Sequence, residues 1–320
     1  MSKRIFVFHV VLILSFLLGA GDLFPKTEPQ INIKLSEVLS IGSLEDDTLF
    51  QWVGVSVDEE SNIYVSDTMD YTIKKFDASG KLMAIKGRRG QGPGEFLSPR
   101  SLAQSNKRVY VIDENIPGIQ VFDDQLNFLN RLSIIQSIAD IEVVSPDHIY
   151  AASLSYDKQG VIICLDLKGD LIREIEFGDR KKEMLKNFIN FEIDSDNYFY
   201  LVYNFDDRIE KFDPSGTLLW STGIFKKIKN KKEKIKNISY FTNIVYKDIA
   251  LDSSGRIYVL GGDFSENKGK DVYVIDPNGS HIATFTLPES SHCIYIDHQD
   301  YLYCRANEGV TLKKFKMIEE

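Results

Sequence analysis

The feature that most constrains the fold of this chain is a tripeptide that recurs six times. Each copy has an apolar residue, then a tyrosine, then a residue that is mostly small or apolar. The six tyrosines are Tyr64, Tyr110, Tyr150, Tyr200, Tyr258 and Tyr303. Successive copies lie 40 to 58 residues apart, which is the length of one four-stranded repeat unit. The repeat therefore sets the architecture before any single residue is considered.

The sequence around each tyrosine follows the same order of strands and turns. A short apolar segment precedes it and usually ends in an acidic turn, as in VSVDEESN. A further segment ends in Phe-Asp or a related pair, as in IKKFDASG, and a fourth follows, as in KLMAIKG. Aspartate favours these turns because its carboxylate accepts backbone hydrogen bonds, and glycine because it adopts positive φ. Four strands in each of six units predict an all-β, six-bladed β-propeller.

The two ends of the repeat region complement each other. The sixth unit stops after its third strand, in VTLKKFKMIEE, whereas residues 31–42 have the pattern of a spare strand ahead of the first unit. Pairing of these two segments would close the ring and leave no open sheet edge. We therefore expect a single propeller domain over residues 22–320, with its last blade closed by an N-terminal strand.

The first residues have the pattern of a targeting segment. Lys3 and Arg4 precede an apolar run from Ile5 to Leu18, and the small residues 19–21 follow. This order is typical of a secretory signal peptide, and the run is short for a bilayer span. We expect a signal peptide over residues 1–21 that is cleaved, and a secreted or periplasmic monomer with no stable membrane span.

Charge and cysteine content limit the partners and the cross-links. The formal net charge of −9 argues against nucleic-acid binding. The three cysteines, Cys164, Cys293 and Cys304, are too few for a disulfide scaffold. Cys293 and Cys304 are expected on adjacent strands of one hairpin and are the one pair considered for a bridge. Buried, unbridged thiols are the favoured alternative.

Two stretches carry a family resemblance. GRRGQGPGEFLSP (residues 87–99) and NIYVSDTMDYTIKKFDASGK (residues 62–81) resemble the NHL-repeat signature and the body of the same repeat. The chain as a whole resembles the exported six-bladed, NHL-like or TolB-like propeller proteins of bacteria, many of which have no assigned activity. The resemblance implies that the glycines serve the crossing from the first blade to the second. A phosphate site is disfavoured, because no helix start or Lys-Ser/Thr pair follows them.

The channel of such a ring is lined by the first strand of each blade. Aligning the six first strands places one row of residues at Gly54, Ser101, Asp140, Asn190, Asp248 and Cys293. The preceding row is Val53, Arg100, Ala139, Ile189, Lys247 and His292. The oxygens of Asp140, Asn190 and Asp248 suit a hard cation such as calcium. The favoured alternative is that they bond channel water and neighbouring backbone, in which case no cofactor is needed.

Basic residues gather in the predicted blade-to-blade links. They are Arg88 and Arg89, Lys181 and Lys182, and the seven lysines of KKIKNKKEKIK (residues 226–236). These links should share one face with Arg100, Lys247 and His292 at the channel mouth. Such a face would attract a protein or an anionic ligand, although a charged run is often only a solvated insertion.

Two functions from different classes compete. The first is a non-catalytic binding or scaffold module that uses the blade-link face. The second is a channel-metal enzyme, because the resemblance brings in propeller lactonases and amidating lyases. The lyases hold their metal with several histidines, and only His292 is expected near the channel here, which argues against a three-histidine zinc site. A carboxylate-held calcium site stays open, but we expect a binding module rather than an enzyme.

Overall fold

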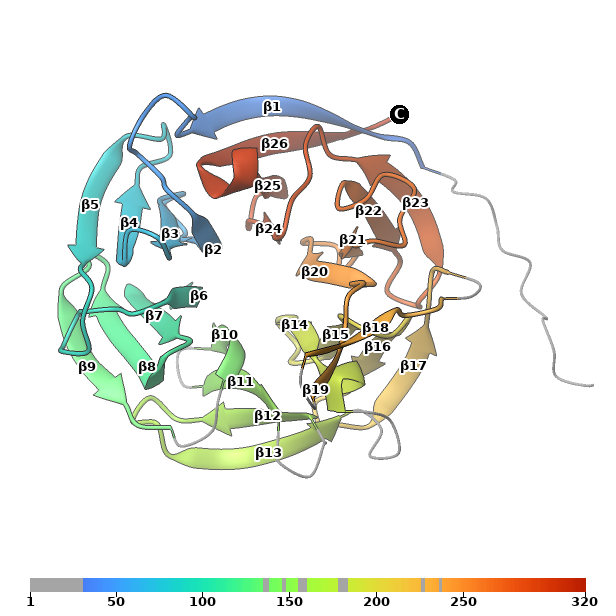
Figure 1. Cartoon of the computed structure of the whole chain (residues 1–320), viewed down its shortest axis with the longest axis horizontal. Helices are drawn as coiled ribbons and strands as arrows, with labels where there is room; N and C mark the ends of the chain where they lie inside the picture. The colour runs from blue at the N-terminus through green and yellow to red at the C-terminus, as the bar shows by residue number, and fades with distance from the viewer. Residues whose placement is uncertain are drawn as a thin grey trace, which may run out of the picture.

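Six four-stranded antiparallel sheets form a ring in the computed structural model of the chain (Figure 1). The structure describes residues 31–134, 138–145, 148–154, 160–177, 184–225, 228–235 and 238–320. The expected signal peptide, residues 1–21, lies outside the described residues. No helix within the described ranges has the length and apolar character to span a membrane. The sheets are the blades of the six-bladed propeller that the repeat predicted.

The first three blades follow one another along the chain, each with its strands in sequence order. Blade 1 comprises β2 (Trp52–Val57), β3 (Ile63–Asp67), β4 (Thr72–Phe76) and β5 (Leu82–Gly87). Blade 2 comprises β6 (Pro99–Ser105), β7 (Arg108–Asp113), β8 (Ile116–Asp123) and β9 (Phe128–Leu132). Blade 3 comprises β10 (Ile138–Ser145), β11 (His148–Leu154), β12 (Gly160–Leu165) and β13 (Leu171–Phe177).

Blades 4 and 5 repeat this order with insertions between them. Blade 4 follows η1 (Met184–Asn187) and comprises β14 (Ile189–Ile193), β15 (Phe199–Tyr203), β16 (Ile209–Phe212) and β17 (Leu218–Thr222). A separate hairpin comes next, formed by β18 (Lys232–Ile235) and β19 (Ile238–Phe241). Blade 5 comprises β20 (Tyr246–Leu251), β21 (Ile257–Gly261), β22 (Asp271–Ile275) and β23 (His281–Thr286).

The sixth blade joins the two ends of the described chain. Its strands are β24 (Ile294–Ile296), β25 (Tyr301–Ala306) and, after η2 (Asn307–Gly309), β26 (Thr311–Glu319), with β1 (Ile33–Ile41) outermost. The register runs from Ile33 opposite Glu319 to Ile41 opposite Leu312. Figure 1 shows β1 as the outer arc beside β26. The predicted closure by an N-terminal strand is confirmed.

The six repeat tyrosines hold equivalent positions, one in the second strand of each blade. None is more than 3 % exposed. Each belongs to a buried cluster whose members come from two adjacent blades. Tyr258, for example, packs in one cluster with Phe285 of its own blade and with Ile294 and Phe315 of blade 6. The repeat tyrosines therefore lie at the seams between adjacent blades.

A turn aspartate fixes the hydroxyl of four of these tyrosines. The acceptor lies six positions earlier in the chain, and the O···O distances are 2.8–3.1 Å for Asp58, Asp194, Asp252 and Asp297. The same carboxylates organise the turn between the first two strands. Asp252, for instance, accepts the backbone N–H groups of Ser254 and Arg256 at 2.9 Å. In four of the six blades, one acidic residue thus joins the turn to the blade interface.

The glycine-rich stretch forms the link from β5 to β6. The Gly92 amide donates to the Glu95 carboxylate at 2.9 Å, and Arg88 forms an ion pair with the same carboxylate at 2.6 Å. The Gly94 amide donates to the Gln120 side chain at 2.9 Å. These partners occupy N–H groups that a bound phosphate would need. The interpretation of the stretch as a blade crossing is confirmed.

The three cysteines are free. Cys164 and Cys304 are buried, while Cys293 lines the channel just before β24. The β24–β25 register places Ile294 opposite Cys304. Cys293 and Cys304 are therefore neighbours in one hairpin, as predicted, but are offset by one residue, and no disulfide joins them.

Removal of β1 tests the closure. Deleting residues 22–41 should expose the edge of β26 and produce dimers or aggregates, because an unpaired strand is a template for pairing with another chain. Size-exclusion chromatography with light scattering measures the outcome. A deletion variant that stays monomeric and melts at the temperature of the full chain would show that β1 does not close the ring.

Loss of one tyrosine hydroxyl tests the turn-to-seam bond. Tyr258→Phe should lower the free energy of unfolding by about 1.5–3 kcal/mol, because a hydrogen bond to a charged, buried acceptor is lost. Tyr110→Phe is the matched control, since no turn aspartate accepts its hydroxyl in the described residues. Urea denaturation of both variants gives the comparison, and equal losses would contradict the proposed role of the aspartate.

Candidate functional site at the channel mouth

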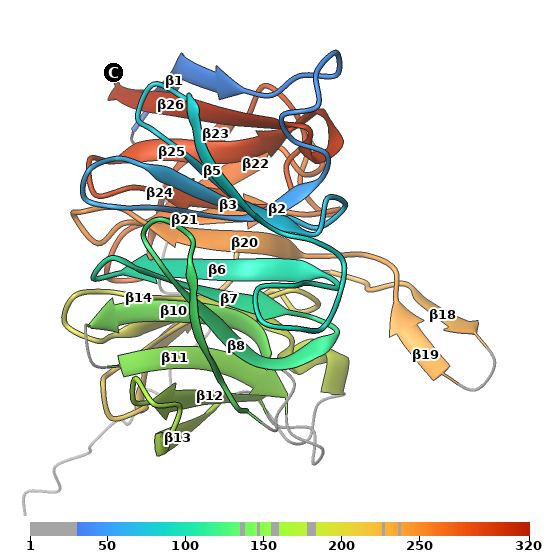
Figure 2. The ribbon, with the colours of Figure 1, turned by 90° about the vertical axis from the view of Figure 1, so that its left-hand side faces the viewer.

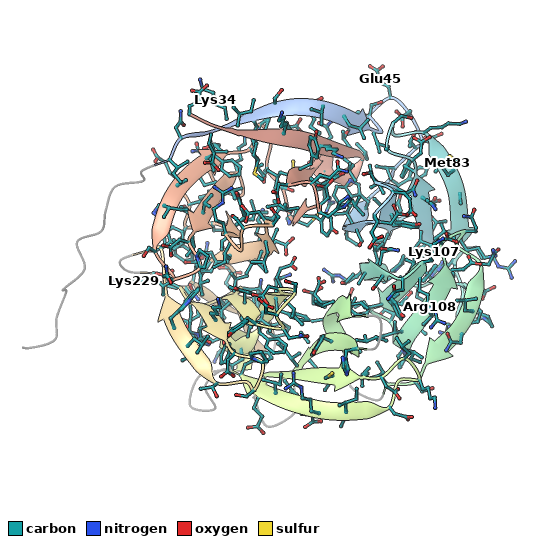
Figure 3. All side chains as sticks on the ribbon, turned by 180° about the vertical axis from the view of Figure 1, so that it is seen from behind. Lys34, Glu45, Met83, Lys107, Arg108 and Lys229 are labelled. Atoms are coloured by element: carbon teal, nitrogen blue, oxygen red, sulfur yellow. The ribbon has the colours of Figure 1, made fainter. Side chains whose placement is uncertain are left out.

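A cavity of about 500 Å³ lies where the six first strands meet. All twelve residues of the two rows aligned in the sequence line it, including Arg100, Asp140, Asn190, Lys247 and Asp248. Register shifts interrupt the regular side-chain alternation near the start of β2, β6, β10 and β20, where consecutive residues line the cavity. Figure 3 shows side chains that reach from the blades toward the open centre of the ring, with Met83 on the outside of the ring. The predicted channel positions are thus gathered in one cavity.

The oxygens considered for a cation are used to join neighbouring chain segments. The Ser101 hydroxyl donates to Asp140 at 2.8 Å, and the Ile294 amide donates to Asp248 at 2.9 Å. Asn190 accepts a hydrogen bond from the Asn204 side chain at 2.8 Å. Across the described ranges, no group of three or more His, Cys, Asp or Glu residues is placed to hold a metal ion. These bonds are the alternative that the sequence left open beside a cation site.

A second layer of residues, which contains two carboxyl groups, lies deeper in the channel. Its residues stand two positions further along each first strand: Ser56, Ala103, Glu142, Glu192, Ala250 and Tyr295. Glu142 and Glu192 belong to the adjacent blades 3 and 4 and both line the cavity. Neither has a hydrogen-bond or ion-pair partner in the part of the chain that the structure describes. Two glutamates thus face the channel without compensation.

The carboxyl groups of the two layers favour their protonated forms. Burial raises the pKa of Asp140 to about 6. Burial, together with repulsion by Glu192, Asp140 and Asp248, raises the pKa of Glu142 well above its usual range. Burial and repulsion by Asp140 and Asp248 do the same for Glu192, and burial with repulsion by Asp140 does so for Asp248. The cause throughout is carboxyl groups collected away from bulk water with no cation among them.

Basic side chains gather instead at the rim of the cavity, in blades 5 and 6. Lys247 donates to the Ser291 carbonyl at 2.8 Å, and Arg305 donates to the Glu308 carbonyl. Arg305 is only 7 % exposed, and its Nε has no hydrogen-bond partner among the described atoms. Neither cation forms an ion pair with a described carboxylate. The rim therefore holds two positive charges whose hydrogen-bond acceptors in the described structure are backbone carbonyls, while Asp263 acts on Lys247, and Asp67 and Glu308 on Arg305, without forming ion pairs.

Desolvation lowers the pKa values of these basic groups, and their mutual repulsion lowers those of Lys247 and His292 further. Burial lowers the pKa of Lys247; Arg305 lowers it further, against the opposite pull of Asp263. Burial also lowers the pKa of Arg305. The pKa of His292 falls to about 4 through burial and the nearby Lys247 and Arg305 charges. At neutral pH His292 is therefore an uncharged imidazole at the rim.

The other predicted basic residues differ in their surroundings. Arg88 and Arg89 lie in the β5–β6 link and do not line the cavity; Arg89 stacks over the Tyr71 ring at 5.7 Å. Arg100 lines the cavity but forms an ion pair with Glu114 at 3.0 Å. Its charge is compensated, in contrast to those of Lys247 and Arg305. The remaining predicted residues Lys181, Lys182, Lys226, Lys227 and Lys236 lie outside the described residues.

The described lysines of residues 226–236 belong to the β18–β19 hairpin and its base. Figure 2 shows this hairpin projecting beyond one face of the ring. An aromatic contact anchors it, because the Phe205 and Phe241 rings stack at 5.5 Å. The chain passes from β19 into β20, whose first residues carry Lys247 at the cavity rim. The hairpin and the channel mouth therefore occupy the same face.

Sequence reasoning missed three residues of this site. Glu142 and Glu192 follow the aligned row by two positions, so the strand alternation already contained the signal. Arg305 lies on the second strand of blade 6, opposite Cys293 in the extended register. The other blades have small or apolar residues there: Ser66, Ile112, Ala152, Val202 and Leu260. An arginine at a repeat position that is otherwise uncharged is the signal that an alignment of second strands would have given.

Comparison with known proteins identifies the fold without a family. No protein-family model matches the sequence, and no curated protein matches it. Among solved structures, virginiamycin B lyase from Staphylococcus aureus is similar, with a TM-score of 0.58 and 12 % identity over 90 % of this chain and 100 % of that chain. A protein of unknown function from Bacteroides thetaiotaomicron has a TM-score of 0.59 and 14 % identity, over 91 % of this chain and 77 % of that chain. A calcium-binding regucalcin from Agrobacterium tumefaciens has a TM-score of 0.55 and 13 % identity, over 84 % of this chain and 92 % of that chain. At these identities the likeness shows the propeller fold alone.

Because Glu142 and Glu192 have no described partner, replacing one of them with a neutral residue should raise the thermal stability, by an amount that depends on pH. A carboxyl group whose pKa is raised by folding stabilises the native state below its ordinary pKa, and this stability is lost as the pH rises through the folded pKa. Glu192→Gln should therefore raise the melting temperature at pH 8, with a difference that shrinks toward pH 4. Glu59→Gln, at an exposed turn, is the control. Melting curves across this range would contradict the account if the two variants behaved alike.

Proposed function

We propose that the chain is a non-catalytic binding propeller that recognises an anionic ligand at its channel mouth. The observation that supports this most strongly is the pair Lys247 and Arg305. Both line the cavity, both are desolvated, and neither forms an ion pair with a carboxylate in the described residues. Buried charges in proteins are normally paired, because removing an ion from water is costly. An anionic group entering the mouth supplies the missing partner.

The chemistry of the rim favours a carboxylate or a phosphate. The guanidinium of Arg305 offers a planar set of donors, and the ammonium of Lys247 offers a compact charge. His292, uncharged at neutral pH, adds a hydrogen-bonding imidazole. The cavity volume of about 500 Å³ lies within the range of small-molecule sites. The ligand is therefore a small anion or an acidic group presented by a protein.

The β18–β19 hairpin supports the same partner class. Its described lysines are Lys229, Lys231, Lys232 and Lys234, and it extends from the face that carries the mouth. Positive charges beside a site raise the local concentration of an anion and the rate of its arrival. The proposed role of the hairpin is to steer the ligand toward the rim. Export by a cleaved signal peptide remains a prediction that accompanies this function.

One observation favours a second candidate, a channel enzyme that uses a carboxylate-held cation. Glu142 and Glu192 have no hydrogen-bond or ion-pair partner in the part of the chain that the structure describes, and Asp140 and Asp248 lie one layer above them. Calcium takes six to eight oxygen ligands, and these side chains supply part of such a set. Calorimetric titration with calcium separates the candidates, because this function requires binding that Glu142→Gln abolishes and Lys247→Gln leaves intact.

Binding of a simple carboxylate tests the first proposal. Hexanoate should bind the full chain, and Lys247→Gln and Arg305→Gln should each weaken that binding at least tenfold. The affinity should also fall with salt, since the Debye length shrinks from about 10 Å at 0.1 M to about 3 Å at 1 M. Isothermal titration calorimetry measures both effects, with the exposed Lys81→Gln as control. Unchanged affinity in Lys247→Gln would refute an anion site at the rim.

A separate experiment tests the steering role of the hairpin. Changing Lys229, Lys231, Lys232 and Lys234 to serine should slow association at low salt and leave dissociation unchanged, because long-range attraction acts on encounter. Surface changes of this kind usually alter the free energy of unfolding by about 0.5 kcal/mol or less. Stopped-flow kinetics with citrate, a multivalent anion, gives both rates. A variant with the wild-type association rate would show that the hairpin is only a solvated insertion.

A further inference from the structure

We propose that the ligand is amphoteric, with an anionic group held by Lys247 and Arg305 and a protonated amine held by Glu142 and Glu192. The inference rests on the proposed function and names the class of ligand. It arises from the arrangement of the cavity lining along the first strands. Lys247 stands at the start of β20, and Glu142 and Glu192, which are unpaired among the described residues, stand further along β10 and β14.

The strand geometry sets the spacing between the two parts of the proposed site. We call Lys247 and Arg305 the upper pole, and Glu142 and Glu192 the lower pole. Lys247 opens β20, and Asp248 follows at the level of Asp140 and Asn190. Glu192 lies two residues beyond Asn190 on β14, which is three positions deeper than the level of Lys247. At about 3.3 Å per residue, the rim and the glutamate layer are roughly 10 Å apart. A ligand that bridges them needs its opposite charges separated by several bonds.

The two poles do not neutralise each other within the protein. Lys247 donates to the Ser291 carbonyl and Arg305 to the Glu308 carbonyl, rather than to any carboxylate of the channel. Glu142 and Glu192 have no basic partner among the described residues. Basic and acidic side chains that share a cavity without pairing keep their desolvation costs, and Glu142 and Glu192 respond by favouring the protonated form. An ammonium group bound between the two glutamates would lower their pKa values and favour the ionised forms. A single molecule that carries both charges compensates both poles at once.

The lower pole suits an ammonium group better than a metal ion. An ammonium has three hydrogen-bond donors and no acceptor, so two carboxylates and one further acceptor satisfy it. Tyr295 comes from blade 6 at the same level, and the charges of Glu142 and Glu192 act on its hydroxyl. A calcium ion would need six to eight oxygens. Within the described chain no group of three or more metal-ligating side chains is placed for that.

An independent observation points to a ligand in this cavity. The Arg305 side chain is 7 % exposed and lines the cavity, and its Nε has no partner in the described structure. A buried donor without an acceptor is rare in native proteins unless a ligand or an ordered water supplies one. The Arg305 guanidinium therefore borders the cavity with one buried donor unpaired among the described atoms.

Three matched probes test the proposal by calorimetry on the full chain at pH 7. They are 6-aminohexanoate, which carries both charges, hexanoate, which lacks the amine, and hexylamine, which lacks the carboxylate. We expect 6-aminohexanoate to bind at least tenfold more tightly than either of the others. Glu142→Gln combined with Glu192→Gln should reduce its advantage over hexanoate to less than twofold, while hexanoate itself still binds. Melting curves confirm that each variant is folded.

The outcomes separate this inference from the function on which it rests. If hexanoate binds as tightly as 6-aminohexanoate, the amphoteric class is wrong and the anion site stands. If 6-aminohexanoate keeps its advantage in the double glutamine variant, the glutamates do not hold the amine, and the inference is again wrong. If neither carboxylate binds, or if hexylamine binds as tightly as 6-aminohexanoate, both the inference and the anion site are refuted.

Discussion

The ring depends on the tyrosine buried at each seam between blades, and in four of the six blades its hydroxyl donates to the aspartate of its own blade's first turn. The tyrosine ring packs between two blades, and its hydroxyl ends at a carboxylate that also holds the turn backbone. A buried hydroxyl needs an acceptor, and a charged acceptor makes the bond stronger than a neutral one. One residue pair therefore sets the turn, the second strand and the contact with the next blade. The pair recurs in four of the six blades, and the six packed sheets bring the first strands to a common centre.

The position of the channel residues follows from that repetition. Each first strand enters the ring from a blade-to-blade link, so equivalent residues of the six strands meet at equal depth. Carboxyl groups from separate blades, such as Asp140 and Asp248, are thereby held near one another although they repel. The closed sheets supply the stability that this arrangement costs, and buried groups of like charge are common where a protein binds a ligand. The fold therefore determines that Lys247 and Arg305 lie at the rim of the cavity and that Glu142 and Glu192 lie in the deeper layer.

Much of this organisation could be predicted from the sequence. The period of the tyrosine tripeptide and the surplus strand at residues 31–42 predicted six blades and their closure, because both depend on local patterns that repeat. The aligned first strands correctly placed Arg100, Asp140 and Lys247 in one cavity. Which charged residues form ion pairs could not be predicted from the sequence, because it depends on side chains that come together only in the folded chain. Arg100 is compensated by Glu114, and Arg305, on a second strand, completes the basic rim.

The central claim is that Lys247 and Arg305 form an anion site that the protein itself leaves unpaired. A crystal soaked in sodium bromide and measured at the bromine absorption edge tests it most directly, because the anomalous signal locates bound anions without any assumption about the ligand. The account predicts a strong bromide peak at the rim, in contact with both side chains, and its disappearance in Lys247→Gln crystals. Bromide peaks confined to exposed lysines, with none at the rim, would contradict it.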